Sequence, residues 1–99
     1  MKGYVIGDIE VTDPAAFAEY GKRVPATIAQ YGGRYIVRGG KMQPLEGAWS
    51  PKRIVVLEFP SVEHARKWYD SPEYRPLIGM RQKASRGSLL IVEGYVPPS

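Results

Sequence analysis

The sequence predicts an α+β fold in which a four-stranded antiparallel sheet carries helices on one of its faces. Four segments show strand-like alternation or runs of β-branched residues, helical segments separate them, and one strand-to-helix pattern occurs twice. The chain has 99 residues, which is enough for one domain around a single core. We therefore expect residues 1–99 to form a single domain.

The first strand and the first helix occupy the N-terminal third of the chain. Residues 3–11 alternate between apolar and polar side chains, as in a strand with one buried face. Asp13 followed by Pro14 is typical of a helix N-terminus. Pro25 lies inside this helix and has no N–H to donate, so we predict a kink or a break near Gly21.

Two strands and a long connection follow. Residues 34–38 form the second predicted strand, and residues 53–59 form the third, with Glu58 near its end. The turn-rich segment 39–51 joins them, and connections of this length are often functional or contact a partner. Trp49 within it is an aromatic residue that a solvated hairpin does not require.

The C-terminal part repeats the pattern of a strand, a stop and a helix. Pro60 cannot continue a sheet ladder, and Ser61 can cap a helix that begins at Val62. A second helical piece is expected over residues 72–84, and the last strand over residues 87–96.

Residues 9–11 and 57–59 align two β-α units, with their helix caps in register. The order of elements is therefore βαβ twice, which predicts the ferredoxin-like plait. We expect the first and third strands to be parallel neighbours at its centre. Glu10 and Glu58, near the ends of these strands, would then lie level with each other.

The helices can cover only one face of this sheet, and alternation along each strand assigns residues to the two faces. The expected covered face comprises Val5, Ile9, Val11, Tyr35, Val37, Val55, Leu57, Phe59, Leu90 and Val92. The expected open face carries Ile6, Ile36, Ile54, Val56, Leu89 and Ile91. Such a patch is unusual on a monomer, so we expect a homodimer that forms through the sheet faces and closes into an α/β barrel.

Polar side chains are expected on the same open face, namely Tyr4, Asp8, Glu10, Arg34, Arg38, Glu58 and Glu93. Ionisable groups in an apolar interior need partners, and such a cluster in a closed cleft is a candidate ligand site. The candidate catalytic acids or bases are Glu58, Glu93 and Asp8. The candidate ligand-binding residues are Arg38, Tyr4, Glu58, Glu93 and Trp49.

Each candidate also has a structural interpretation. Glu58 and Glu93 could form ion pairs with an interior arginine and so fix the register of the dimer. Arg38 could bind a carboxylate in a bidentate fork or pair with an acid at the barrel mouth. Trp49 could cover the barrel or pack against the other subunit. His64, the sole histidine, falls on the first turn of a helix, and its role stays open.

Several classes of chemistry lack their sequence signals. Cysteine is absent, which excludes disulfides and thiol chemistry and is consistent with a reducing cytoplasm. Neither a signal-peptide core nor a membrane span is visible, so we expect a cytoplasmic protein without a membrane partner. Zinc spacing, a phosphate loop, a nucleophile elbow and a dinucleotide fingerprint are also absent, so we expect neither a metal nor a cofactor.

The run EFPSVEHARKWYDSPEYR, with DIEVTDP before it, YIVRGG between and IVEGY at the end, resembles the family called domain of unknown function 1330. The resemblance covers essentially the whole chain. It implies membership of the dimeric α/β-barrel superfamily, which includes cofactor-free monooxygenases, isomerases and haem enzymes of the chlorite dismutase type. His64 matches neither a haem ligand nor the histidine of a His-Asp dyad in those relatives.

Three functional hypotheses follow. The first is a binding protein or cofactor-free enzyme that acts on a small, partly apolar molecule inside the dimer barrel. The second is a non-catalytic homodimer whose barrel is filled by side chains. The third is an RNA-binding plait, which we rank last because the third strand lacks base-stacking aromatic residues and the open face carries acids that repel phosphate.

Overall fold

Four strands form a single sheet in the computed structural model, which describes residues 1–98. The strands are β1 (Gly3–Val11), β2 (Arg34–Arg38), β3 (Ile54–Phe59) and β4 (Ser85–Glu93). Their order across the sheet is β2-β3-β1-β4, and each neighbouring pair is antiparallel. The predicted α+β, ferredoxin-like fold is therefore confirmed.

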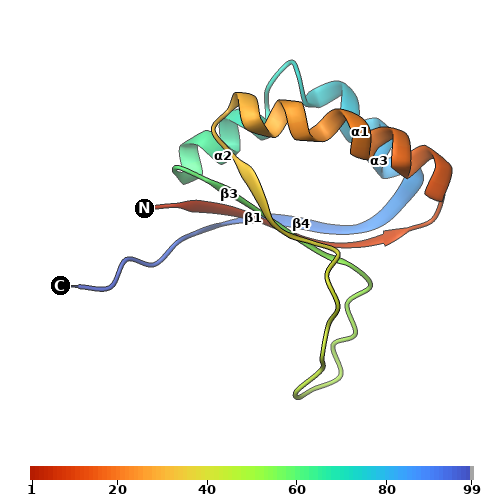
Figure 1. Cartoon of the computed structure of the whole chain (residues 1–99), viewed down its shortest axis with the longest axis horizontal. Helices are drawn as coiled ribbons and strands as arrows, with labels where there is room; N and C mark the ends of the chain where they lie inside the picture. Colours follow the sequence, from red (N-terminus) through yellow and green to blue (C-terminus); the bar gives the residue numbers. More distant parts are fainter. Residues whose placement is uncertain (99) are drawn as a thin grey trace.

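The helices lie on one face of this sheet, whereas the β2–β3 connection extends from the opposite side (Figure 1). They are α1 (Pro14–Gln30), α2 (Val62–Tyr69) and α3 (Arg75–Ala84). The side chain of Asp13 caps α1 and that of Ser61 caps α2, as predicted, each by accepting a main-chain N–H bond of 3.1 Å. Within the described residues, none of the helices is long and apolar enough to cross a membrane.

A kink or a break was predicted near Gly21, and the first helix is continuous, so there is no break. Pro25 cannot donate to the carbonyl of Gly21 one turn earlier. That carbonyl instead accepts a hydrogen bond of 3.3 Å from Nη2 of Arg38. The helix thus tolerates its interior proline partly because a side chain from β2 supplies the missing donor.

The central strands β1 and β3 are antiparallel, so the expected parallel pairing was wrong. The reason is the connection between β2 and β3. Strand β2 runs in the same direction as β1, and the chain then reverses its direction before β3. As a result, Glu58 lies opposite Tyr4, whereas Glu10 lies opposite Arg86. The two carboxylates are therefore at different ends of the sheet.

The predicted faces of β4 were also inverted. Ile91 lies opposite Val5 on the covered face, and Leu90, which is 56% exposed, lies opposite Ile6 on the open face. The run of aliphatic residues in this strand gives no alternation from which its faces could be assigned. The covered face receives Leu89 and Ile91, and the open face receives Leu90 and Val92.

A β-bulge inverts the end of β2. The register shifts between Tyr35 and Val37, so that Val37 pairs with Val56 and Arg38 pairs with Val55. A bulge adds one residue to one strand and thereby reverses the alternation beyond it. Val37 therefore lies on the open face and Arg38 on the covered face, the reverse of the prediction.

The core lies between the helices and the covered face. Its largest fully buried side chains are Trp68, Tyr74, Phe59, Ile28 and Val24. The indole Nε1 of Trp68 donates a hydrogen bond of 3.0 Å to Thr27 Oγ1, which joins α2 to α1 inside the core. Tyr74 packs against Trp68, with 4.0 Å between their ring centroids. This aromatic layer forms one wall of the site described below.

Candidate functional site

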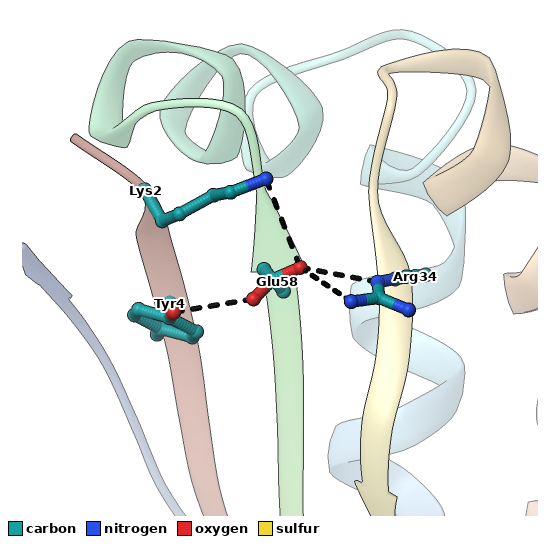
Figure 2. Close-up of polar contacts among 4 residues, drawn as sticks. All are labelled: Lys2, Tyr4, Arg34 and Glu58. Atoms are coloured by element: carbon teal, nitrogen blue, oxygen red, sulfur yellow. Dashed lines mark hydrogen bonds and ion pairs between the residues drawn. The ribbon is translucent and has the colours of Figure 1, made fainter. Parts of the chain in front are cut away.

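Glu58 is the centre of a polar cluster on the open face (Figure 2). Its carboxylate accepts hydrogen bonds from Arg34 at 3.1 and 3.0 Å and from the hydroxyl of Tyr4 at 3.1 Å. The ammonium of Lys2 lies 4.0 Å away. The antiparallel register places these groups together, because Glu58 lies opposite Tyr4 on one side and Arg34 on the other.

These contacts keep Glu58 ionised. The hydrogen bonds from Arg34 are the main cause that lowers the pKa of this carboxyl, and Tyr4 adds to the effect against an opposing contribution from burial. A carboxyl group with a lowered pKa has no proton to donate at neutral pH, and its carboxylate is a weak base. The cluster therefore favours the ion-pair interpretation of Glu58 over the catalytic one.

Asp8 holds the long connection against the sheet. Its carboxylate accepts bonds from Trp49 Nε1 at 3.2 Å and from the main-chain N–H of Lys52 at 3.0 Å. Trp49 is otherwise 69% exposed. Asp8 and Trp49 border an open hollow of about 500 Å³ on the open face, whose floor includes Ile6 and Leu90.

The other predicted site residues lie elsewhere. Glu93 is exposed and lies opposite Gly3, so it is not on the face that carries Glu58. Arg38 lies on the covered face because of the bulge. The ring of His64 contacts the Ser61 hydroxyl, with 2.7 Å between Nδ1 and Oγ, at the exposed start of α2. The structure therefore groups Tyr4 with Glu58 and Asp8 with Trp49, but it does not join the predicted residues into one site.

A cavity of about 60 Å³ lies on the other side of the sheet, between its covered face and the helices. The sequence did not predict it. Its lining residues come from all four strands and all three helices, together with Arg53 and Tyr74 from the connections. They are Val5, Ile9, Phe17, Tyr20, Gly21, Val24, Tyr35, Arg38, Arg53, Val55, Leu57, Trp68, Tyr74, Arg81 and Leu89.

Two tyrosine hydroxyls meet at the wall of this cavity. Tyr20 on α1 and Tyr74 before α3 are both buried, and their hydroxyl oxygens are 2.8 Å apart in a hydrogen bond. Burial is the main cause that raises the pKa of each phenol, and the guanidinium of Arg81 opposes this in both. Burial also raises the pKa of Tyr35. The three phenols are therefore neutral hydrogen-bonding groups at physiological pH.

Among residues 1–98, three arginines provide the only charged side chains that line the cavity. Arg38 lies over the ring of Tyr35, 4.3 Å from its centroid, and Arg53 lies 5.4 Å from the ring of Phe17. Arg81 is buried, with only 8% of its surface exposed, and its Nε has no hydrogen-bond partner within the described part of the chain. None of the three forms an ion pair within residues 1–98.

Sequence reasoning missed Tyr20, Tyr74 and Arg81 as site residues. Tyr20 fits the apolar stripe of the first helix, and Tyr74 has the character of a core or interface aromatic residue. For Arg81 a signal was present: it follows Leu77 by one helical turn and shares with it the buried side of α3. A charged residue on the buried stripe of a helix requires a partner or a ligand.

The four-stranded antiparallel sheet with its helices on one face is an α+β fold of the ferredoxin-like type. A family model for "Domain of unknown function (DUF1330)" matches residues 2–95. The chain therefore belongs to the DUF1330 family, as the sequence resemblance indicated. Curated protein sequences include no significant match to it.

Solved structures with the same fold cover nearly the whole chain. A protein of unknown function from Rhodopseudomonas palustris has a TM-score of 0.76 and 19% identity, covering 97% of this chain and 84% of that one. SnoaB from Streptomyces nogalater, a cofactor-independent oxygenase, has a TM-score of 0.64 and 15% identity, covering 97% and 95%. Rv0793 from Mycobacterium tuberculosis has a TM-score of 0.55 and 15% identity, covering 100% and 98%. At these identities, the similarity establishes the fold alone.

Proposed function

We propose that this protein binds a small, mostly apolar molecule in the cavity between its helices and its sheet. The observation that carries the proposal is the composition of the cavity wall, in which aliphatic and aromatic side chains surround a few convergent polar groups. Small-molecule sites typically have this composition, because apolar contacts supply affinity and a few polar groups fix orientation. The cavity replaces the interior of the dimer barrel as the favoured position of the ligand.

A homodimer through the open face is the second part of the proposal. Leu90, Val92 and Val37 are exposed there, beside the half-buried Ile6 and Val56. A second copy of the chain would cover these side chains, and the dimeric α/β-barrel type of the similar structures supports this arrangement. The Glu58 cluster would then lie at the subunit interface, where its charges are already paired.

Cofactor-free catalysis on the bound molecule is a second candidate function. It is favoured by the Tyr20–Tyr74 hydroxyl pair, because neutral donors in an apolar cavity can stabilise an oxyanion that develops during a reaction. The likeness to a cofactor-independent oxygenase agrees with this candidate. Consumption of dissolved oxygen by the protein with a bound ligand would support catalysis. Ligand binding without turnover would show that the protein binds the molecule but does not convert it.

The position of the ligand can be tested with two neighbouring residues on β3. Val55 lines the cavity, whereas Val56 pairs with Ile6 on the open face. A fragment screen by ¹H–¹⁵N NMR would identify ligands that shift the signals of cavity residues. We expect Val55→Phe to abolish binding by filling the cavity, and Val56→Phe to leave it intact.

The opposite pattern would contradict the proposal. Loss of binding in Val56→Phe alone would place the ligand on the open face or in the barrel. If no fragment bound to the wild-type protein, the cavity would be a packing defect and the non-catalytic homodimer would stand.

A further inference from the structure

The cavity has an electrostatic property that the proposed function does not require. The described part of the chain contributes Arg38, Arg53 and Arg81 to its lining but neither an aspartate nor a glutamate. Its phenols stay protonated, so they do not compensate the positive charge. A neutral apolar ligand would leave the positive charge of these arginines without a compensating negative charge.

Arg81 is the group for which the imbalance is most costly. Its side chain is more than nine-tenths buried, and the buried Nε–H finds no acceptor among residues 1–98. A buried donor without a partner is unfavourable, and a buried guanidinium without a counter-ion is more so. Other members of the core show the contrast: the buried Nε1 of Trp68 donates to Thr27, and the buried hydroxyls of Tyr20 and Tyr74 bond each other.

The geometry points to a small organic monoanion, a carboxylate with a short apolar body, as the ligand of this cavity, with Arg81 binding its head group. This inference rests on the proposed function, because it specifies the charge of the molecule that the cavity holds. A carboxylate can accept from a guanidinium through two parallel bonds, and such charge-assisted bonds are stronger than neutral ones. The hydroxyls of Tyr20 and Tyr74 lie near Arg81, and the one that does not donate to the other can donate a further bond to the head group.

The remaining walls define the body of the ligand and its entry. Val5, Val24, Leu57 and Leu89 offer only apolar contacts. The cavity volume of about 60 Å³ corresponds to roughly four to six water-sized groups, which is the size of a short-chain carboxylate. Arg38 is exposed and Arg53 half-buried, so these two lie toward solvent, where their charge would draw an anion inward.

The experiment compares butanoate with its neutral analogue butanamide, which has the same number of non-hydrogen atoms. Binding is measured by ¹H–¹⁵N NMR, including the side-chain Nε–H signal of Arg81. We expect butanoate to shift this signal and to bind at least about tenfold more tightly than butanamide. We also expect Arg81→Gln to remove this preference.

Arg86 provides the matched control, because it is an exposed arginine close to Arg81 in the chain that already faces Glu10, with 3.9 Å between Nε and Oε1. Arg86→Gln is expected to keep the preference for butanoate. If Arg81→Gln fails to fold, the Nε–H shift in the wild-type protein and the affinity of Arg81→Lys decide the question. The lysine variant should retain part of the preference, because it keeps the charge but loses the planar fork.

The outcomes separate this inference from the proposal on which it rests. If both compounds bind within about twofold of each other, the cavity binds ligands but does not select anions, and the inference fails alone. If butanoate binds without moving the Nε–H signal of Arg81, the assignment of Arg81 fails. If neither compound nor any fragment binds in the cavity, the proposed function fails as well.

Discussion

The guanidinium of Arg38 donates a hydrogen bond of 3.3 Å to the carbonyl of Gly21, the carbonyl that Pro25 leaves without its helical donor. Two local irregularities produce this contact. The bulge in β2 turns Arg38 toward the helices, and the proline in α1 frees an acceptor for it. Because Gly21 and Arg38 both line the cavity, the contact joins α1 to β2 beside the proposed site.

This relationship predicts that Pro25 and Arg38 are energetically coupled. Pro25→Ala restores an N–H for the Gly21 carbonyl, and we expect it to raise the free energy of unfolding by as much as about 3 kcal/mol. Arg38→Met should cost about 1 kcal/mol in the wild-type protein and less in the Pro25→Ala background. Urea unfolding of the single and double variants measures this difference. Equal costs in both backgrounds would contradict the coupling.

The hydroxyl groups of Tyr20 and Tyr74 should also be energetically coupled. Either Phe substitution leaves the other buried hydroxyl without its partner, so we expect each to cost about 1–3 kcal/mol of unfolding free energy. The double variant should cost less than the sum of the two, because no orphaned hydroxyl remains. Tyr69→Phe is the control, since Tyr69 makes no side-chain hydrogen bond within residues 1–98, and we expect little change there. Strictly additive costs in urea unfolding would argue against the pair.

Much of the fold could be predicted because its signals are local. The helix caps Asp13 and Ser61 follow from residue type, and the repeat of the β-α unit identifies the ferredoxin-like plait. The errors occurred where the signal is non-local or absent. A bulge at Ile36 has no residue signature in YIVRGG, and an aliphatic run such as Leu89–Val92 fits either face.

The candidate site was harder to predict than the fold for the same reason. Arg38 and Leu89 were predicted on the open face but lie on the covered face, where both line the cavity. The sequence suggested Glu58 because an acid in an apolar strand is conspicuous, yet its partners are supplied by neighbouring strands. Arg81 was less conspicuous in a helix rich in basic residues, although its spacing from Leu77 placed it on the buried side.

The lowered pKa of Glu58 predicts a stability difference that depends on pH. A carboxyl whose pKa is lower in the folded state, below its ordinary value of 4.5, stabilises the fold above that value, and the contribution is lost as pH falls through the folded pKa. We expect the wild-type protein to be more stable than Glu58→Gln at pH about 7, with the difference shrinking below about 4.5. Urea midpoints across this range provide the measurement.

The exposed Glu93 is the control for this pH series. It forms no ion pair within the described residues, so Glu93→Gln should resemble the wild-type protein at neutral pH. A constant difference between wild type and Glu58→Gln from neutral to acidic pH would mean that the charge of Glu58 contributes nothing and that only the shape of the side chain matters.

The exposed apolar side chains of the open face predict that the protein assembles through this face. Leu90 is 56% exposed in the isolated chain, and the proposed dimer would bury it against a second copy. Leu90→Glu would place a charge in that interface, so we expect it to convert the dimer to a monomer in sedimentation velocity at micromolar concentration. Lys67→Glu, on the exposed side of α2, should remain dimeric. A wild-type protein that sediments as a monomer would overturn the proposed dimer, whereas a Leu90→Glu variant that stays dimeric would place the interface on another surface.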